Sequence, residues 1–214
     1  MILTEILENS YKNHPEKTAI FYKEKKISYN QLYHQSRSLA AFLTNKGLRK
    51  GDRVGLIVKK NPDAIISFLG IAQAGGVFYS VDYNQPGDSI QYTIDLTRPS
   101  FLIISSEFID SLKTFNVRKY GTKVIIIGEE NPDHFTWQEA TSFEIKLGFD
   151  VKIEKHDPVY LNFTSGSTGK PKGAVTTHDN LYWNTKSVVE AFKFTPDDIH
   201  LCGFPIFTHP HELF

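Results

Sequence analysis

The stretch Thr164-Ser165-Gly166-Ser167-Thr168-Gly169-Lys170-Pro171-Lys172-Gly173 combines four hydroxyl side chains, three glycines and two lysines within ten residues. No acidic side chain interrupts it. The apolar runs on either side, residues 159–163 and 174–177, have the composition of β-strands. The sequence therefore predicts a polar loop that joins two strands.

The composition of this loop favours anion binding over an ordinary surface turn. Glycines let backbone N–H groups turn toward a ligand and approach it closely. Hydroxyls add hydrogen-bond donors, and the ammonium groups of Lys170 and Lys172 add charge-assisted ones. We therefore expect the loop, residues 164–173, to bind a polyphosphate. A solvated turn between two strands is the alternative interpretation.

Spacing excludes two common phosphate loops. A Walker A loop has glycine five positions before its Gly-Lys pair and Ser or Thr directly after it. Here Gly169-Lys170 has Thr164 five positions back and Pro171 after it. A dinucleotide-binding fingerprint opens a helix, whereas a strand is expected after Gly173.

The ten residues resemble the signature phosphate loop of the AMP-forming adenylating enzymes. That superfamily includes acyl-CoA synthetases, the adenylation domains of peptide synthetases and the luciferases. Three other segments resemble its motifs in the same order: residues 27–32, with Gln31 where the family has Glu, residues 69–78, and residues 204–214. The resemblance covers the whole chain but only the N-terminal part of such an enzyme, so we expect the chain alone to be catalytically incomplete.

Strand-like segments without alternation, separated by helical segments, predict an α/β fold. They indicate a doubly wound, mostly parallel sheet covered by helices on both faces. We predict a doubly wound subdomain over residues 1–128, a connector over 129–157, and a phosphate-loop region with the start of a substrate-pocket subdomain over 158–214. Within the last region, a helix over residues 180–192 is expected to turn Trp183, Val188, Val189 and Phe192 toward the core.

Composition excludes several other classes of protein. Lys and Arg number 24, as do Asp and Glu, so no basic excess indicates a nucleic-acid or anionic-membrane partner. The single cysteine rules out an internal disulfide and suits a cytoplasmic protein. Residues 64–81 carry no charge, but Gly75-Gly76 interrupts them, so a buried helix, a turn and a strand are expected there instead of a membrane span.

The final eleven residues, 204–214, would decide the substrate class. The resemblance places Phe207 where amino-acid-activating relatives have an aspartate that pairs with the substrate ammonium. An aromatic ring cannot neutralise an ammonium, so a small carboxylic acid without an α-amino group is favoured. The resemblance also places His209 beside the reacting carboxylate, with His211 as an alternative. A polar surface turn is the alternative role for both histidines.

The resemblance implies an ATP-dependent acid–thiol ligase. The acid would form an acyl-adenylate, and a thiol of CoA or of a carrier protein's phosphopantetheine would then displace AMP. Residues 164–170, Lys172 and Gly173 would bind the phosphates, and the protein ligand of Mg²⁺ would lie beyond this chain. Two other functions stay open: an amino-acid adenylation domain that serves a carrier protein, and a non-catalytic nucleotide-binding or scaffold remnant. A metal site at His200, Cys202, His209 and His211 matches no common zinc spacing.

Overall fold

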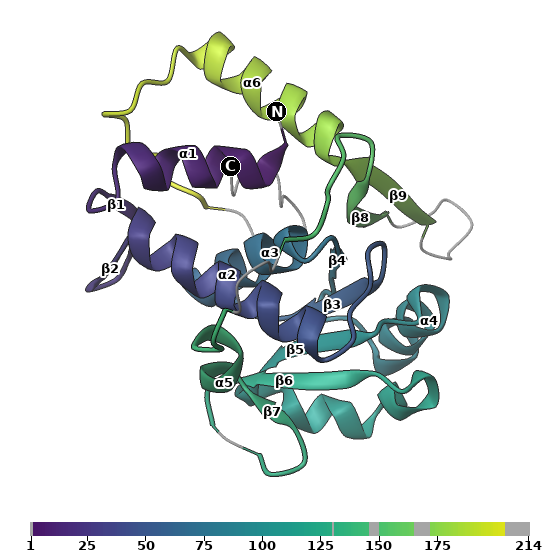
Figure 1. Ribbon diagram of the computed structural model, residues 1–214. Coiled ribbons are helices and arrows are strands. Elements are labelled where there is room, and N and C mark those ends of the chain that lie inside the picture. Colours follow the sequence, from purple (N-terminus) through teal and green to yellow (C-terminus); the bar gives the residue numbers. More distant parts are fainter. Residues whose placement is uncertain (1, 130, 146–149, 165–171, 204–214) are drawn as a thin grey trace.

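The structure is a computed structural model that describes residues 2–129, 131–145, 150–164 and 172–203. Its centre is a seven-stranded sheet with the strand order β7-β6-β5-β3-β4-β8-β9 (Figure 1). All neighbouring strands are parallel except β8 and β9. The strands are β3 (Arg53–Ile57), β4 (Val77–Ser80), β5 (Phe101–Ser105), β6 (Lys123–Ile127), β7 (Phe135–Thr136), β8 (Pro158–Thr164) and β9 (Lys172–Thr177). The predicted doubly wound, mostly parallel α/β fold is thus confirmed.

The chain begins with a helix, a hairpin and a second helix. These are α1 (Leu3–Asn13), the antiparallel strands β1 (Thr18–Tyr22) and β2 (Lys25–Ser28), and α2 (Tyr29–Asn45). A capping box, a pattern of Ser followed three residues later by Gln, starts α2. The Gln31 N–H donates to the Ser28 hydroxyl at 3.2 Å, and the Ser28 N–H donates to the Gln31 side chain at 3.0 Å.

Successive residues of the central strands point to opposite faces of the sheet and enter two separate cores. Leu102 and Ile104 of β5 pack with α4 (Gly87–Thr97) and the 3₁₀ segments η1 (Ser106–Lys113) and η2 (Val117–Tyr120). Phe101 and Ile103 pack on the other face, with α1, α2, α3 (Pro62–Gln73) and α5 (Trp137–Thr141). The sheet is therefore the middle of three layers.

Helix α3 lies at the centre of the larger core because of three local features. Asn61 caps it, since its side chain accepts from the Ala64 N–H at 3.1 Å. Gly70 allows close approach to α2, because a Cβ there would lie 2.7 Å from a methyl of Leu39. Gly75, at φ +71°, makes the turn into β4. Residues 64–81 thus form the predicted helix, turn and strand. None of the described helices combines the length and apolarity that a membrane crossing requires.

Two elements differ from the sequence prediction. Residues 107–115, whose composition favours an α-helix, instead contain the 3₁₀ segment η1, at the end of which the Thr114 N–H donates to the Ser111 carbonyl three residues back at 2.9 Å. The predicted connector, residues 129–157, contributes the two-residue strand β7 to the sheet. The division of the chain into three regions stays a prediction, although β8 and β9 continue the same sheet.

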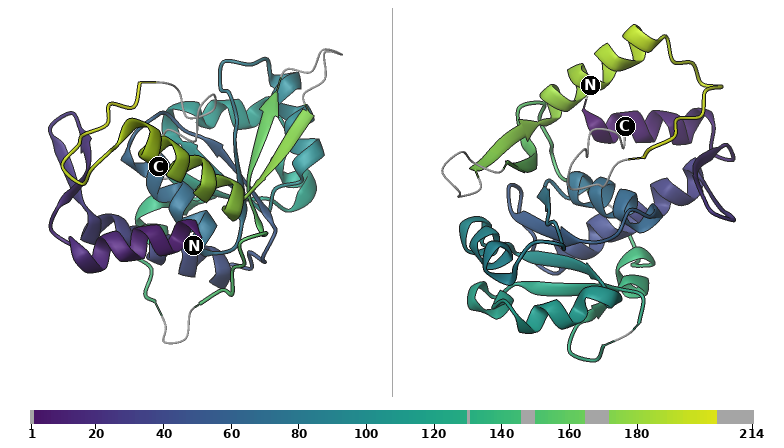
Figure 2. Two further views of the ribbon diagram at one scale, coloured as in Figure 1. Left: turned by 90° about the horizontal axis from the view of Figure 1, so that it is seen from above. Right: turned by 180° about the vertical axis from the view of Figure 1, so that it is seen from behind.

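The expected packing of the last helix is wrong. In α6 (His178–Phe192), Trp183 is 54% exposed and Phe192 is 71% exposed, and Val188 and Val189 are also exposed. Figure 2 shows the reason: α6 lies at the periphery, and its C-terminal end points away from the sheet. The apolar pattern identified a helix correctly, but no described element covers its second half.

Candidate functional site

The predicted phosphate loop is held between strands β8 and β9. These strands pair antiparallel, and their last pair joins Thr164 of β8 to Lys172 of β9. Residues 165–171, between them, lie outside the described residues. Of the predicted phosphate-binding residues, the structure thus places Thr164, Lys172 and Gly173. The predicted strands before and after the loop are confirmed. The roles of these residues in phosphate binding stay a prediction.

The two strands are packed closely where the loop leaves them. A Cβ at Gly173 would lie 3.2 Å from the ring of Phe163, which is its register partner on β8. Glycine therefore lets the strands approach without displacing that ring. Lys172 is exposed on β9, so its ammonium can reach a ligand at the loop without breaking a buried contact.

The register of the sheet shows at which edge the loop emerges. Strand β8 runs parallel to β4, with Tyr160 opposite Phe78, and β4, β3 and β5 are parallel to one another. The carboxyl end of β8, at Thr164, therefore lies at the same edge as the carboxyl ends of β3, β4 and β5. In open α/β sheets this is the edge at which ligands bind.

Four side chains gather at the carboxyl edge of the sheet. The Lys59 ammonium, just after β3, forms an ion pair with Glu107 of η1 and lies 5.7 Å from the centroid of the Phe108 ring. Phe108 in turn stacks on Tyr83, which follows β4, with ring centroids 4.4 Å apart. The hydrogen bond from Lys59 to Glu107 raises the pKa of the Lys59 ammonium. These contacts tie together the segments that follow β3, β4 and β5.

The segment that leads to the predicted substrate residues reaches the same edge. The Lys60 ammonium donates to the carbonyl of Cys202 at 2.7 Å. The structure thus brings Thr164, the first residue of the predicted phosphate loop, and Cys202, two residues before the segment 204–214, to the carboxyl edge of the sheet. Phe207, His209 and His211 lie outside the described residues, so their predicted roles stay predictions.

Other candidate sites receive no support from the described part of the chain. In that part, no group of three or more His, Cys, Asp or Glu side chains could hold a metal ion. The protein ligand of Mg²⁺ that the resemblance implies is expected outside this chain. A pocket of about 600 Å³, lined by Gln91, Phe115 and His134 among others, lies between α4 and the 3₁₀ segments. It contains none of the predicted site residues.

Sequence reasoning missed the cluster that anchors β8 and α6 to the rest of the fold. The Lys50 ammonium lies 2.6 Å from the carboxylate of Asp157, and the His178 N–H donates to the Asp157 carbonyl at 3.1 Å. Burial lowers the pKa of the His178 imidazole to about 4, although the Asp157 carboxylate nearby opposes this shift. Lys50 and Asp157 are 107 residues apart, so no local signal could have found the pair.

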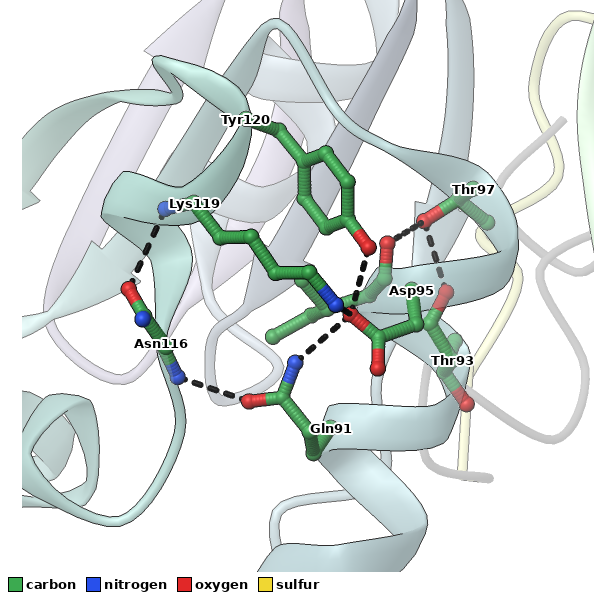
Figure 3. A network of polar contacts seen from close by, with 8 residues as sticks. Gln91, Thr93, Asp95, Thr97, Asn116, Lys119 and Tyr120 are labelled. Atoms are coloured by element: carbon green, nitrogen blue, oxygen red, sulfur yellow. Dashed lines mark hydrogen bonds and ion pairs between the residues drawn. The ribbon is translucent and has the colours of Figure 1, made fainter.

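A second polar network lies at the opposite edge of the sheet and has a structural role. The Asp95 carboxylate near the end of α4 accepts hydrogen bonds from Gln91 at 2.9 Å, from Lys119 at 3.1 Å and from the Tyr120 hydroxyl at 2.7 Å (Figure 3). The hydrogen bond from Tyr120 comes first among the causes that lower the pKa of Asp95. Helix α4 ends just before β5 begins, and η2 ends just before β6 begins. The network therefore lies at the amino ends of β5 and β6, whereas Thr164 lies at the carboxyl edge of the sheet.

Comparison with known protein families identifies this chain. Residues 7–211 match the model of the AMP-binding enzyme family, so the chain belongs to that family. Its relatives include a CoA ligase and a nonribosomal peptide synthase. The resemblance found in the sequence is therefore confirmed.

Individual relatives extend well beyond the matched region. Gramicidin S synthase 2 from Brevibacillus brevis is 31% identical over 84% of this chain and 4% of that protein. 4-hydroxybutyrate–CoA ligase 2 from Metallosphaera sedula is 26% identical over 96% of this chain and 40% of that protein. The chain thus spans less than half the length of these relatives.

Solved structures of similar sequence agree with the fold. ATP-bound MatB from Rhodopseudomonas palustris is 27% identical, with a TM-score of 0.86 over 100% of this chain and 42% of that chain. An ATP-bound chimera of RpMatB and BxBclM is also 27% identical, with a TM-score of 0.83 over 98% of this chain and 41% of that chain. Here too the match covers less than half of the solved chain.

Proposed function

We propose that this chain is the phosphate-binding part of an ATP-dependent carboxylic acid ligase. The observation that carries the proposal is the loop of residues 164–173, set between β8 and β9 at the carboxyl edge of the sheet in a member of the AMP-binding enzyme family. The ATP-bound state of MatB supports ATP as the nucleotide. CoA or a carrier phosphopantetheine would be the thiol acceptor, and the cytoplasm the location.

The reaction would proceed in two steps. A carboxylate oxygen of the acid attacks the α-phosphorus of ATP, the bond from that phosphorus to the bridging oxygen breaks, and pyrophosphate leaves. The thiol sulfur then attacks the acyl carbon, and AMP leaves. Loop N–H groups, the hydroxyls of Thr164 and Thr168, and the lysines 170 and 172 would stabilise the negative charge that develops on the departing pyrophosphate.

The acid itself would be bound by the segment after Cys202. His209 would lie beside the reacting carboxylate, and Phe207 would leave no partner for an ammonium. A simple aryl or acyl acid is the proposed substrate class. The second candidate substrate is an α-amino acid, which would be delivered to a carrier protein. One observation favours it: this chain is 31% identical to gramicidin S synthase 2 and only 26% identical to the CoA ligase.

The proposal is tested with a defined polypeptide, here called the MatB chimera. It joins the 214-residue chain to the part of R. palustris MatB that follows the matched region. We expect the chimera, given acid and Mg²⁺, to convert ATP to AMP and pyrophosphate. The 214-residue chain alone should form neither AMP nor pyrophosphate. Formation of ADP and phosphate, or acid-dependent AMP formation by the chain alone, would contradict the proposal.

A further inference from the structure

The pocket between α4 and the 3₁₀ segments, here called the α4 pocket, is large enough to hold a small molecule. Its volume of about 600 Å³ falls within the range of roughly 300–1,000 Å³ that is common for ligand sites. None of the ten residues that line it is Asp or Glu, and none belongs to the segments 164–173 or 204–214. A ligand bound there would therefore leave the proposed nucleotide and acid sites free.

Part of the wall of the α4 pocket is apolar. Phe115 and Val117 are buried in the core on that face of the sheet, and Ile109 and Leu112 are half-buried and pack against the same core. All four side chains line the pocket. Contact with a ligand would remove apolar surface from water on both partners, which favours a ligand with an apolar body.

Two asparagine side chains of the wall keep their donors while their oxygens are already used. The Oδ1 atom of Asn116 accepts from the Lys119 N–H at 3.1 Å, and the Asn116 N–H donates to Gln91 at 2.7 Å (Figure 3). The Oδ1 atom of Asn131 accepts from the Asp133 N–H at 3.0 Å. Neither NH₂ group donates to another group in the described part of the chain. Both side chains therefore offer donors to a ligand.

These donors are held in place before any ligand binds. Gln91, which accepts from the Asn116 N–H, is itself fixed because its side chain donates to Asp95 at 2.9 Å. Asn131 is fixed by a turn in which the His134 N–H donates to the Asn131 carbonyl at 3.1 Å. The imidazole of His134 also lines the pocket and can donate a further hydrogen bond. Groups that are already ordered lose less entropy on binding.

Lys113 is the lysine at the rim of the α4 pocket, and its ammonium is already paired. It lies 2.6 Å from the Asp110 carboxylate, and the two side chains are 81% and 83% exposed. The pair therefore stays in solvent, where salt screens it, and provides no fixed contact to a ligand. The pocket thus combines an apolar wall with neutral hydrogen-bond donors, and no carboxylate lines it.

We propose that the α4 pocket is a second binding site, which takes a carboxylic acid with an aryl or alkyl body. A carboxylate has acceptors only, so it can accept from the NH₂ groups of Asn116 and Asn131 in charge-assisted bonds while its apolar body covers the apolar wall. A neutral amide would instead bring donors for which these two side chains have no uncommitted oxygen. Binding here does not depend on ligase activity, so failure of the proposed function would leave this site standing.

Three small molecules test the proposal on the unmodified 214-residue chain. Phenylacetate, phenylacetamide and acetate are titrated into the isotope-labelled chain at neutral pH, and the NMR shifts of its amide groups are followed. We expect phenylacetate to shift the amide signals of Asn116 and Asn131 and to bind at least about tenfold more tightly than the other two. Equal affinity for phenylacetate and phenylacetamide would overturn the proposal. Absence of shifts, or shifts confined to residues outside the pocket, would also overturn it.

Two separate substitutions give an independent result. Asn116→Asp and Asn131→Asp each keep the oxygen that accepts a backbone N–H and replace the NH₂ donor by a negative charge. Each should leave the Tm unchanged and weaken phenylacetate binding at least about tenfold.

Asn184→Asp is the matched control, because Asn184 is exposed on α6 and does not line the pocket. It should leave the affinity for phenylacetate unchanged. Unchanged affinity in both folded pocket variants, or an equal loss in the Asn184 variant, would overturn the proposal. If a pocket variant does not fold, the comparison of phenylacetate with phenylacetamide decides, since it needs no substitution.

Discussion

The ammonium of Lys50 lies 2.6 Å from a carboxylate oxygen of Asp157. Lys50 stands just before β3, and Asp157 just before β8. This contact therefore fixes the start of β8 near the start of β3 in the same sheet, and the hydrogen bond from the His178 N–H to the Asp157 carbonyl fixes the start of α6 there as well. Burial would raise the pKa of Asp157, but the hydrogen bonds from Lys50 and from the Glu154 N–H outweigh it and lower the pKa. The carboxylate is therefore stabilised in its charged form.

Asp157→Asn should destabilise the chain. The substitution removes the ion pair and weakens the bond from the Glu154 N–H, and because the Lys50 side chain is 39% exposed the expected loss is only about 1 kcal/mol. Urea denaturation measures it. Asp110→Asn is the matched control, since its ion pair with Lys113 is almost fully exposed and its loss should have no measurable effect. Equal effects of the two substitutions would contradict the anchoring role.

His178 should make stability fall as the pH is lowered. The buried imidazole has a pKa of about 4 in the folded chain, whereas in the unfolded chain it binds a proton near pH 6.5. Below pH 6.5 the unfolded state therefore binds more protons, and the free energy of unfolding should decrease by roughly 2 kcal/mol between pH 7 and pH 5 from this group. Denaturant titrations at several pH values measure the decrease.

The contribution of His178 is isolated by comparison of two variants. His178→Gln should remove most of this pH dependence, whereas His14→Gln should retain it, because His14 is exposed at the end of α1. If the acid-induced loss of stability is unchanged in His178→Gln, the group responsible is not His178.

Gly70→Ala should also destabilise the fold. The added methyl would lie 2.7 Å from Leu39, and relief of that overlap should cost about 1–3 kcal/mol, more than the gain in helix propensity of up to about 1 kcal/mol. Gly203→Ala is the control, because no atom lies within 4 Å of a Cβ at that position. In a double-mutant cycle, the loss in free energy of unfolding for Gly70→Ala combined with Leu39→Ala should be smaller than the sum of the two single losses. Strict additivity of these losses would show that the two sites do not touch.

Lys172→Ala should lower the rate of adenylation in the MatB chimera and leave its Tm unchanged. The exposed ammonium makes no core contact, and loss of a charge-assisted bond to a phosphate is worth roughly 1.5–3 kcal/mol, about ten- to a hundredfold in rate. Thr164→Ala and Thr168→Ala should act in the same direction. Lys113→Ala, an exposed lysine on η1, serves as the control. Unfolding of the Lys172 variant would indicate a structural loop instead.

Local signals predicted the fold well and the site only in part. Caps such as Ser28 with Gln31, and Asn61 before Pro62, could be predicted because both partners lie within a few residues. The apolar pattern of α6 identified a helix, but periodicity cannot tell what covers a face, so Phe192 was wrongly placed in the core. Lys50 with Asp157 and Lys60 with Cys202 are contacts between distant segments, which only the folded chain brings together.

The proposed ligase would activate a simple carboxylic acid by forming an adenylate. Acid-dependent exchange between ATP and pyrophosphate measures that step directly, and it is run on the MatB chimera with panels of aryl acids, fatty acids and α-amino acids. Because an ammonium buried against Phe207 would lose its hydration without gaining a partner, we expect exchange with aryl or acyl acids and none with amino acids. Exchange confined to one amino acid, or none with any acid, would contradict it.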